Sequence, residues 1–383
     1  GLNMTDKELN SILDGCIEKV RATLEETKDA FPSYPHSATE GRWKYSGELE
    51  WKTLVDGYWT GGFWIGLLLL AERLAGGGGF GGWAGRWFEE FARRARREGL
   101  HDMGFLFYPS GVLKWKLEGD REAAEAARTA ATGLAGRYSS MYRCITIFQR
   151  PPMDRILAID TMMNLPLLWW AACETQNEVW RRIAGNHADT TLENMVRDDG
   201  STFHIAKFSP LERKIDEFAT WQGRAPDSCW ARGQAWAVAG YAYSFMYTGE
   251  KRYEDAFEKT CAFFGENLPE DLVPYWDMKV VDNAKYEWQR EPRDSSALAI
   301  AAHGALVSGK EEFRPVAGKW LEALADRCMA QEHEPGLLKH VCFHKPAGED
   351  VDCACVFADF YFLLALGMYT GRMANPYLPP TPG

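Results

Sequence analysis

The sequence predicts an all-α fold in which helical hairpins close into a ring. Apolar residues recur at helical spacing in segments spread along the whole chain. Runs of β-branched residues bounded by Asn-Gly or Asp-Gly, which mark paired strands, are missing. A turn that carries an acidic or aromatic residue repeatedly opens an apolar helix. Together these observations favour a closed helical architecture.

The first helix is predicted near the start of the chain. Thr5-Asp6-Lys7-Glu8 forms a capping-box pattern, in which a threonine and a glutamate satisfy each other's backbone N–H groups. Apolar residues follow at helical spacing, namely Leu9, Ile12, Leu13, Cys16, Val20 and Leu24.

Further helices are predicted where apolar residues keep the helical period and alanine, the strongest helix former, is frequent. These segments are Tyr58 to Leu74, Glu89 to Arg97, Arg121 to Gly136, Asp160 to Thr175, Trp230 to Tyr247, Tyr253 to Asn267, Ser295 to Val307, Pro315 to Met329 and Phe357 to Tyr369. The run Gly76 to Gly82 is predicted to be a flexible loop.

The recurring turn supports six hairpins in one ring. Its aspartates are Asp102, Asp160, Asp227, Asp294 and Asp352, spaced by 58, 67, 67 and 58 residues, about the length of two helices with their loops. In such a toroid the turns that open the inner helices converge on one concave surface. Asp is also a common N-cap. We favour capping for Asp294 and Asp352 and leave both roles open for Asp102 and Asp160.

Composition excludes several classes of protein. The 383 residues, 46% hydrophobic and 25% charged, can form either two domains or one large closed architecture, and we predict a single domain over residues 1–383. A net charge of −11 argues against nucleic acid as a partner. The apolar stretch Phe63 to Ala71 is too short to cross a membrane.

The cysteines and the first residues bear on location. Nine scattered cysteines do not form the framework of a small disulfide-rich domain, so we expect a reducing compartment, the cytoplasm. The first ten residues lack the basic and apolar regions of a signal peptide. A periplasmic location is the alternative if a signal peptide precedes Gly1.

Two kinds of side chain suggest carbohydrate chemistry. Several of the sixteen tryptophans stand beside glycine or polar turns, where flat amphipathic rings can stack on a sugar: Trp59, Trp64, Trp221, Trp230 and Trp236. Paired carboxylates are the usual apparatus for cleaving glycosidic bonds. Asp102 and Asp160 each stand beside an apolar stretch, where burial would raise the pKa of a carboxyl.

The segment Thr220 to Trp236, TWQGRAPDSCWARGQAW, is the densest in polar and aromatic residues. Arg232 is positioned to clamp a carboxylate bidentately while a tryptophan stacks on the ligand, which suggests an anionic sugar. The structural alternative is that Arg232 pairs with Asp227.

We expect neither a metal nor a cofactor. The glycine run lacks the Lys-Ser/Thr and the preceding strand of a phosphate-binding loop. His340 and His344, with cysteines nearby, match no standard metal-ligand spacing.

The chain resembles the unsaturated glucuronyl hydrolases, glycoside hydrolase family 88. The resemblance covers nearly the whole chain, and its most specific parts are WARGQAW and IDTMMNLPLL. The matching stretches are Gly62 to Ala71, His101 to Phe105, Ile159 to Ala171, Asp199 to Phe208, Thr220 to Trp236, Arg293 to Leu306, Gly336 to His340 and Phe357 to Leu366.

The resemblance implies an (α/α)6 barrel that acts on unsaturated uronyl di- or oligosaccharides left by polysaccharide lyases. Such enzymes hydrate the C4=C5 double bond of the terminal uronate. Asp160 is similar to the general acid/base that protonates C4, and Asp102 to the second essential carboxylate. By the same resemblance His204, Gln222 and Arg232 would bind the uronate, and Trp64, Trp230 and Trp236 would pack around it.

Two alternatives stand beside this reading. The related unsaturated rhamnogalacturonyl hydrolases of family 105 share fold and chemistry, although Gln234 and Ala235 in WARGQAW favour the glucuronyl group. A glycan-binding toroid without activity is the other, and retention of both Asp102 and Asp160 argues against it. By the resemblance, the loop Lys339 to Cys355 lies where the rest of the substrate would be met; its basic residues Lys339, His340, His344 and Lys345 either contact the substrate or, as the default interpretation, are solvated.

Overall fold

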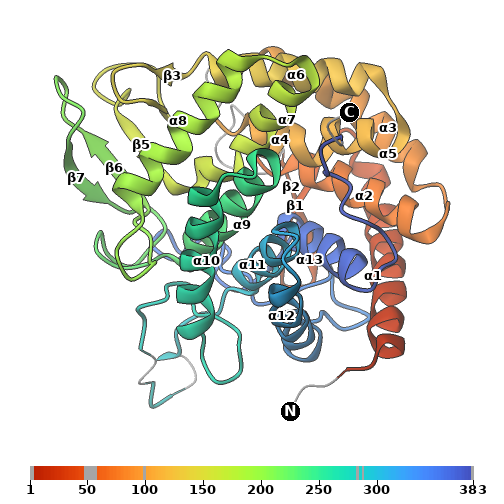
Figure 1. The fold of residues 1–383 in the computed structure, drawn as a ribbon. Coiled ribbons are helices and arrows are strands. Elements are labelled where there is room, and N and C mark those ends of the chain that lie inside the picture. Colours follow the sequence, from red (N-terminus) through yellow and green to blue (C-terminus); the bar gives the residue numbers. More distant parts are fainter. Residues whose placement is uncertain (1–3, 47–57, 98–100, 282–283, 287–288, 381–383) are drawn as a thin grey trace.

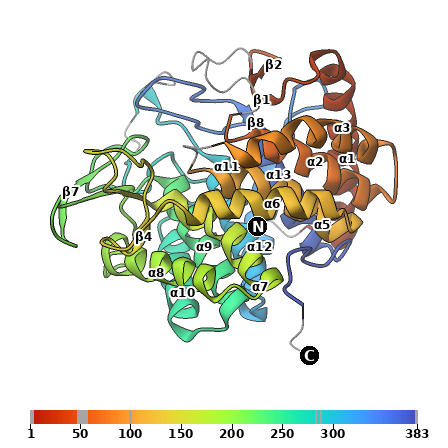
Figure 2. The same cartoon turned by 90° about the horizontal axis from the view of Figure 1, so that it is seen from above.

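The computed structural model describes residues 4–46, 58–97, 101–281, 284–286 and 289–380. The chain forms an (α/α)6 barrel, which confirms the predicted fold class (Figures 1 and 2). Neighbouring inner helices contact one another around the ring, and α13 contacts α2 to close it. The inner helices are α2 (Gly61–Ala75), α4 (Met103–Phe107) continued by α5 (Leu113–Glu118), α7 (Leu165–Thr175), α9 (Ala231–Thr248), α11 (Ser295–Val307) and α13 (Val356–Tyr369).

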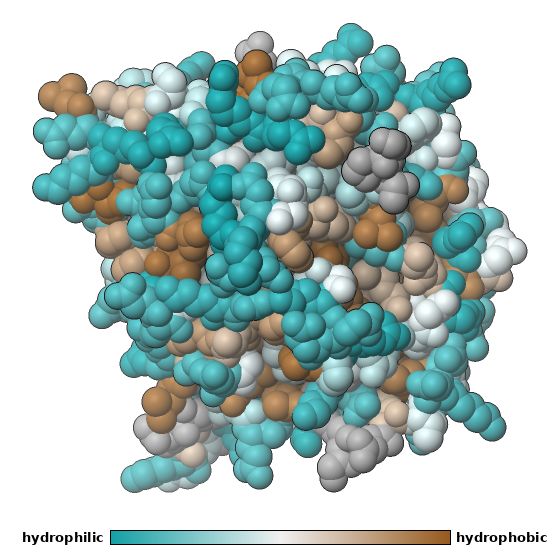
Figure 3. Space-filling model, in the orientation of Figure 1, coloured by the Kyte–Doolittle hydropathy of each residue, from teal (hydrophilic) through white to brown (hydrophobic). Residues whose placement is uncertain are grey.

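The outer helices alternate with the inner ones along the chain. They are α1 (Asp6–Thr27), α3 (Phe80–Phe91), α6 (Arg121–Ala135), α8 (Glu178–Met195), α10 (Lys251–Glu266) and α12 (Arg314–Arg327). Thr5 and Glu8 form the predicted capping box at the start of α1. Outer helices bury one face, whereas nearly every residue of α9, α11 and α13 is buried. The face seen in Figure 3 is accordingly mostly hydrophilic, with small hydrophobic patches between.

Glycines let the inner helices approach closely. A Cβ on Gly62 of α2 would lie 2.1 Å from the carbonyl oxygen of Leu106, and one on Gly104 of α4 would lie 2.2 Å from the Cα of Asn164. No side chain fits at either position. The glycines therefore bring the turns before α2, α4 and α7 to one end of the barrel.

The structure corrects several predicted helices. The glycine run is a turn only as far as Gly79, because α3 begins at Phe80 and includes Gly81 and Gly82. The helix predicted over 89–97 is the end of α3 and the 3-10 segment Ala92–Arg96. The start of the helix predicted at Asp160 is likewise a 3-10 segment, Ile159–Met163. A π-helical turn, Tyr108–Val112, joins α4 to α5, and the sequence gives no signal for it.

In the part of the chain that the structure describes, short strands form three small antiparallel sheets in the loops between the helices. One antiparallel sheet has the order β2-β1-β8, formed by β1 (Pro35–Thr39), β2 (Arg42–Tyr45) and β8 (Ala354–Cys355). A second pairs β3 (Tyr138–Ser139) with β4 (Cys144–Ile145). The third, β5-β6-β7, pairs Leu157 with Ala206 and projects at the left edge of Figure 1. Its strands are β5 (Ile156–Ala158), β6 (Ile205–Phe208) and β7 (Ile215–Ala219).

These sheets place residues at the barrel end where the inner helices begin. β5 leads into the turn that carries Asp160, β7 leads into Trp221 and Gln222, and β8 leads into α13. Each of the nine cysteines is a free thiol. Among the described helices, none has the length and apolar character needed to span a membrane.

Candidate active site

A cavity of about 230 Å³ lies where the inner helices begin. Its walls come from the turns that precede α2, α4, α7 and α9 and from the loop before α13, as the recurring turn predicted. The volume is below the ~300–1,000 Å³ of pockets for drug-sized ligands, so it suits a single sugar ring. The lining residues are Tyr58, Trp59, His101, Asp102, Phe105, Asp160, Trp221, Gln222, Trp230, Arg232, Trp236, Phe343 and His344.

The two predicted carboxyls meet in this cavity, and neither caps a helix. Asp102 stands at the N-cap position of α4 but makes no side-chain cap bond. Its Oδ1 accepts a hydrogen bond from Nδ2 of Asn164 at 3.3 Å. Asp160 lies in the 3-10 turn after β5, and its Oδ1 is buried with no hydrogen-bond partner in the structure. Asp160 thus lines the cavity while one of its two carboxyl oxygens is buried without a donor.

Burial governs the protonation of the pair. Burial is the largest cause of the rise in the pKa of Asp102 and of Asp160, each to about 6; the nearby Asp102 charge contributes to the rise at Asp160, and His101 opposes it. Asn164 and Arg137 act in the opposite direction on the pKa of Asp102. Two carboxyls this close are most stable when they hold one proton between them.

His101 completes a cluster that the sequence analysis did not single out. Its Nε2 lies 3.2 Å from Oδ1 of Asp102, and burial lowers the pKa of His101 to about 4, so the ring is neutral near neutrality. The polar atoms of His101, Asp102 and Asp160 all lie within 4.8 Å of one another. Such a group can exchange protons with a bound ligand.

Arg232 is buried beside the cavity but is not free to act as a clamp. Its Nη1 donates to Oδ2 of Asp294 at 3.1 Å and to the Cys342 carbonyl, and its Nη2 donates to the Phe343 carbonyl and to Oε1 of Gln222 at 2.7 Å. These four partners use the four Nη hydrogens. The expected bidentate clamp is therefore wrong for this arrangement.

The structural alternative for Arg232 is also corrected. Its partner is Asp294, not Asp227, since Asp294 is buried beside it at the start of α11. Asp294 also accepts the backbone N–H of Ser296, which confirms the predicted cap. Arg232 also fixes the side chain of Gln222, because its Nη2 donates to Oε1 of Gln222. The Nε2 of Gln222 is left to donate to a ligand.

Aromatic rings form much of the cavity wall. Trp230 and Trp236 line it as predicted, and Arg232 lies over the Trp230 ring at 4.7 Å. Trp59 and Trp221, which the sequence analysis also marked for sugar stacking, line it too. Trp221 is 39% exposed, so it stands at the mouth.

Two predicted site residues lie outside the lining. Trp64 is fully buried in the core, where its ring packs edge-on against Trp87 at 5.7 Å, because it faces the outer helices and not the barrel axis. His204 lies behind the wall: its Nδ1 is 2.9 Å from Thr220 and accepts the backbone N–H of Trp221 at 3.2 Å. His204 thus holds the Trp221 and Gln222 segment.

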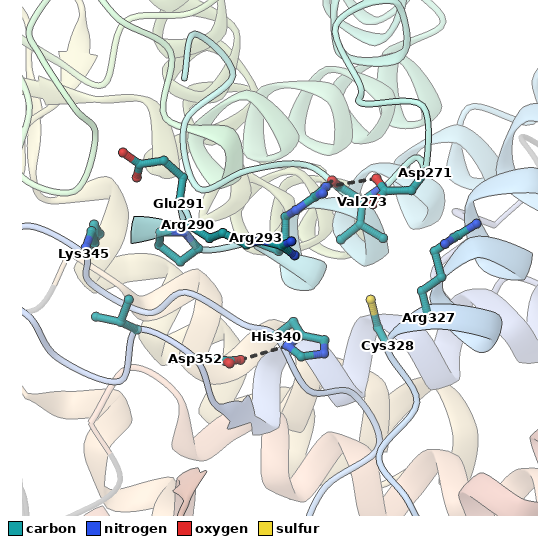
Figure 4. A pocket seen from close by; sticks show the side chains of 12 residues that line it. Asp271, Val273, Arg290, Glu291, Arg293, Arg327, Cys328, His340, Lys345 and Asp352 are labelled. Carbon is teal, nitrogen blue, oxygen red and sulfur yellow. Dashed lines mark hydrogen bonds and ion pairs between the residues drawn. The ribbon is translucent and has the colours of Figure 1, made fainter. Parts of the chain in front are cut away.

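A second cavity of about 510 Å³ adjoins the loop before α13 (Figure 4). Arg293 pairs with Asp271 on one side of it and His340 pairs with Asp352 at 3.0 Å on the other. The capping role predicted for Asp352 is wrong, because α13 begins after Cys355. Lys345 lines this cavity while the adjacent His344 lines the smaller one, so one loop borders both.

Several lining residues had no signal strong enough to be found from the sequence. Tyr58, Phe105 and Phe343 are aromatic residues like many others in this chain. His101 was quoted only within a matching stretch, although its place before Asp102 is a signal. His344 was considered as a metal ligand and as one of the basic residues of the loop Lys339 to Cys355 that could contact the rest of the substrate, but not as part of the uronate site.

The chain is similar in sequence to known enzymes. No family model matches the chain. The chain is 30% identical over 390 residues to an unsaturated chondroitin disaccharide hydrolase of Streptococcus pyogenes serotype M1, covering 98% of this chain and 94% of that protein.

Solved structures agree. A crystal structure of an unsaturated glucuronyl hydrolase from Bacillus sp. GL1 superposes with a TM-score of 0.88 at 27% identity, covering 98% of this chain and all (100%) of that chain. A variant of the enzyme from Streptococcus agalactiae, complexed with dGlcA-GalNAc6S, gives a TM-score of 0.80 at 27% identity, with coverage of 96% and 92%.

Proposed function

Because the chain belongs to the unsaturated glucuronyl hydrolases, we propose that it removes the terminal 4,5-unsaturated glucuronic acid from lyase-generated oligosaccharides of chondroitin or hyaluronan. It does so by adding water across the C4=C5 double bond. The relatives named above for chondroitin disaccharides and for a dGlcA-GalNAc6S complex support this substrate class.

The observation that carries the proposal is the buried carboxyl pair in a cavity the size of one sugar ring. Burial raises the pKa of both members to about 6, so a protonated and an ionised carboxyl coexist near that pH. Hydration of an enol ether needs those two states: an acid near carbon and a base near water.

We assign the two roles from the surroundings of each carboxyl. Asp160, with one oxygen buried and unpartnered, protonates C4 of the unsaturated ring. A water then adds at C5, and an ionised carboxylate of the pair takes its proton. Asp102, which accepts a hydrogen bond from Asn164, tunes Asp160 and receives ring hydroxyls. The hydrated product is a hemiketal that opens and releases the next sugar.

Binding of the uronate follows from the remaining walls. The Nε2 of Gln222 donates to the substrate carboxylate, while Arg232 supplies a buried positive charge next to it. Trp230 and Trp236 pack against the faces of the ring. His204 acts indirectly by holding the Trp221 and Gln222 backbone.

The test follows the loss of the ultraviolet absorbance of the conjugated uronate. Unsaturated disaccharides of chondroitin and hyaluronan are mixed with the wild type, with Asp160→Asn and with Asp102→Asn. We expect decay with the wild type and a loss of at least about 100-fold in each variant, the lower end of what positioned acid–base catalysis contributes.

The matched control is Asp216→Asn, an exposed aspartate on β7, which leaves the rate unchanged. Decay only on an unsaturated rhamnogalacturonan disaccharide would overturn the substrate assignment. Wild-type decay that survives in both variants would overturn the assignment of the carboxyls.

A further inference from the structure

We infer that Asn164 is a positioning residue that decides which of the two active-site carboxyls carries the shared proton. The inference rests on the proposed function and concerns a residue that lies outside the cavity lining. Asn164 keeps Asp102 ionised and so leaves the proton on Asp160.

The orientation of the Asn164 amide is fixed by its surroundings. The side chain is fully buried, and its Oδ1 accepts the backbone N–H of Phe105 at 3.0 Å. The amide nitrogen therefore has to face the other way, toward Oδ1 of Asp102 at 3.3 Å. Its backbone N–H is used as well, by the carbonyl of Thr161. Asn164 can thus only donate to Asp102.

The packing leaves little freedom for this contact to change. Gly104 lies against the Asn164 backbone, where even a Cβ would approach its carbonyl oxygen to 2.5 Å. Asn164 also connects the two turns that carry the carboxyls, since it ends the 3-10 segment of Asp160 and bonds to the first turn of α4. One side chain thereby links both carboxyl-bearing turns.

The two carboxyls are treated differently by their neighbours. Asp102 receives the Asn164 donor and faces His101 and the positive charges of Arg94 and Arg137. Burial and the nearby Asp102 charge raise the pKa of Tyr58, so this phenol is neutral beside the pair. Donors and cations favour the ionised form of a carboxyl.

Asp160 lacks a comparable donor at its buried oxygen. Its Oδ1 has no hydrogen-bond partner in the structure; the Asp102 charge raises the pKa of Asp160, while His101 and Arg232 act in the opposite direction. A buried oxygen without a donor stabilises a carboxylate poorly. The shared proton therefore belongs on Asp160, where the proposed mechanism needs an acid.

Replacing Asn164 tests this placement through the pH dependence of kcat. Asn164→Asp keeps the shape and an acceptor for Phe105 but offers no donor to Asp102 and adds a negative charge. Asn164→Ala removes the donor to Asp102 together with the acceptor for Phe105, and adds no charge. In both variants Asp102 is harder to ionise, so the acid limb of the kcat profile moves to higher pH.

We expect the acid limb to move by about one pH unit in Asn164→Ala, as loss of a hydrogen bond to a charged group implies, and further in Asn164→Asp. kcat at pH 5, below the limb, falls by about tenfold, while KM for the disaccharide stays within about twofold. The matched control is Asn194→Asp, where an amide on α8 donates only to the Thr190 carbonyl. Its profile stays that of the wild type.

Each outcome is decisive. A wild type without absorbance decay overturns the proposed function itself. A working wild type with folded Asn164 variants that keep the wild-type acid limb overturns only the inference, as does a change confined to KM. If neither variant folds, as judged by circular dichroism, Asn164 serves the fold and not the proton, and the inference again fails.

Discussion

At the scale of single residues, the chemistry depends on how far water is kept from a few carboxyls. Asp102 and Asp160 lie in one corner of the cavity, and burial raises both pKa values. A carboxyl is stabilised in its neutral form by the same burial that makes its anion costly. The pair is thereby prepared to give and take protons near neutrality.

The pH dependence of kcat should follow from this pair. With both pKa values raised to about 6, activity is expected to peak close to pH 6. Below the peak the base becomes protonated, and above it the acid loses its proton. Initial rates between pH 4 and 9 at saturating disaccharide measure this. A rate that still rises beyond pH 8 would contradict it.

Asp359 on α13 offers a prediction about stability. It is buried, accepts the Leu338 backbone N–H at 3.0 Å, and burial raises its pKa to about 7. An acid with a raised pKa binds its proton more tightly in the folded state. Its cost to stability is therefore absent below the unfolded pKa and grows as pH rises toward the folded pKa.

Asp359→Asn should remove this pH-dependent cost, because the amide keeps an acceptor for Leu338 and cannot ionise. Relative to the wild type, the variant gains stability between pH 5 and pH 8, on the order of 1 kcal/mol for each unit by which the pKa is raised. Denaturant unfolding at both pH values measures the gain. A difference that is constant with pH would refute the linkage.

At the scale of elements, the packing of the barrel depends on glycines at the points where inner helices are in closest contact. Gly62 and Gly104 stand where α2, α4 and the turn before α7 cross, and each lies against backbone atoms that cannot move aside. The same contacts set the distance between the turns that carry Asp102 and Asp160.

Gly104→Ala should therefore reduce stability and activity together. Its Cβ would overlap the Asn164 backbone, and we expect a loss of about 3 kcal/mol or more together with a marked loss of kcat. Gly82→Ala is the matched control: it lies in α3 with nothing within 4 Å, and it should gain up to about 1 kcal/mol at unchanged kcat. Thermal unfolding and initial rates measure both, and an unaltered Gly104→Ala would refute the argument.

The predictability of each element from sequence depends on its burial. Inner helices such as α9, α11 and α13 were found because they are apolar on nearly all sides. The outer helix α8, Glu178–Met195, was missed because its sequence is largely polar and only one face is buried. Tertiary packing, not local propensity, makes it a helix.

The site shows the same limit. Asp102, Asp160, Gln222, Trp230, Arg232 and Trp236 were named from motifs and line the cavity. Trp64 was misplaced because helical spacing does not say which face of α2 points to the axis. Phe343 reaches the cavity from a loop far along the chain, and Asn164 contributes only through Asp102. Contacts of that kind are set by the closed ring and not by neighbours in sequence.

At the scale of the whole molecule, the end of the barrel opposite the cavity is sealed by the segment after α13. Tyr377 is buried and stacks on Tyr108 with ring centroids 4.3 Å apart. The hydroxyl of Tyr108 bonds to that of Tyr247, near the end of α9. The seal thus joins parts of the chain that are distant in sequence.

Tyr377→Ala should weaken the fold and spare the chemistry. We expect a loss of about 3 kcal/mol, typical of an aromatic ring removed from a core. kcat should stay within about twofold, because the cavity lies at the other end of the inner helices. Leu378→Ala, 54% exposed, is the control that leaves both unchanged. A large fall in kcat for Tyr377→Ala without loss of stability would contradict this separation.

The common direction of the inner helices has an electrostatic consequence. The turns that open α2, α7 and α9 line the cavity, so the backbone dipoles of these helices point their positive ends toward it, each equivalent to roughly half an elementary charge. The chain as a whole carries −11, and the proposed substrate is an anion. The acidic surface repels an anionic substrate, whereas the backbone dipoles attract it at the cavity. Because this attraction comes from the backbone, substitution of side chains does not remove it.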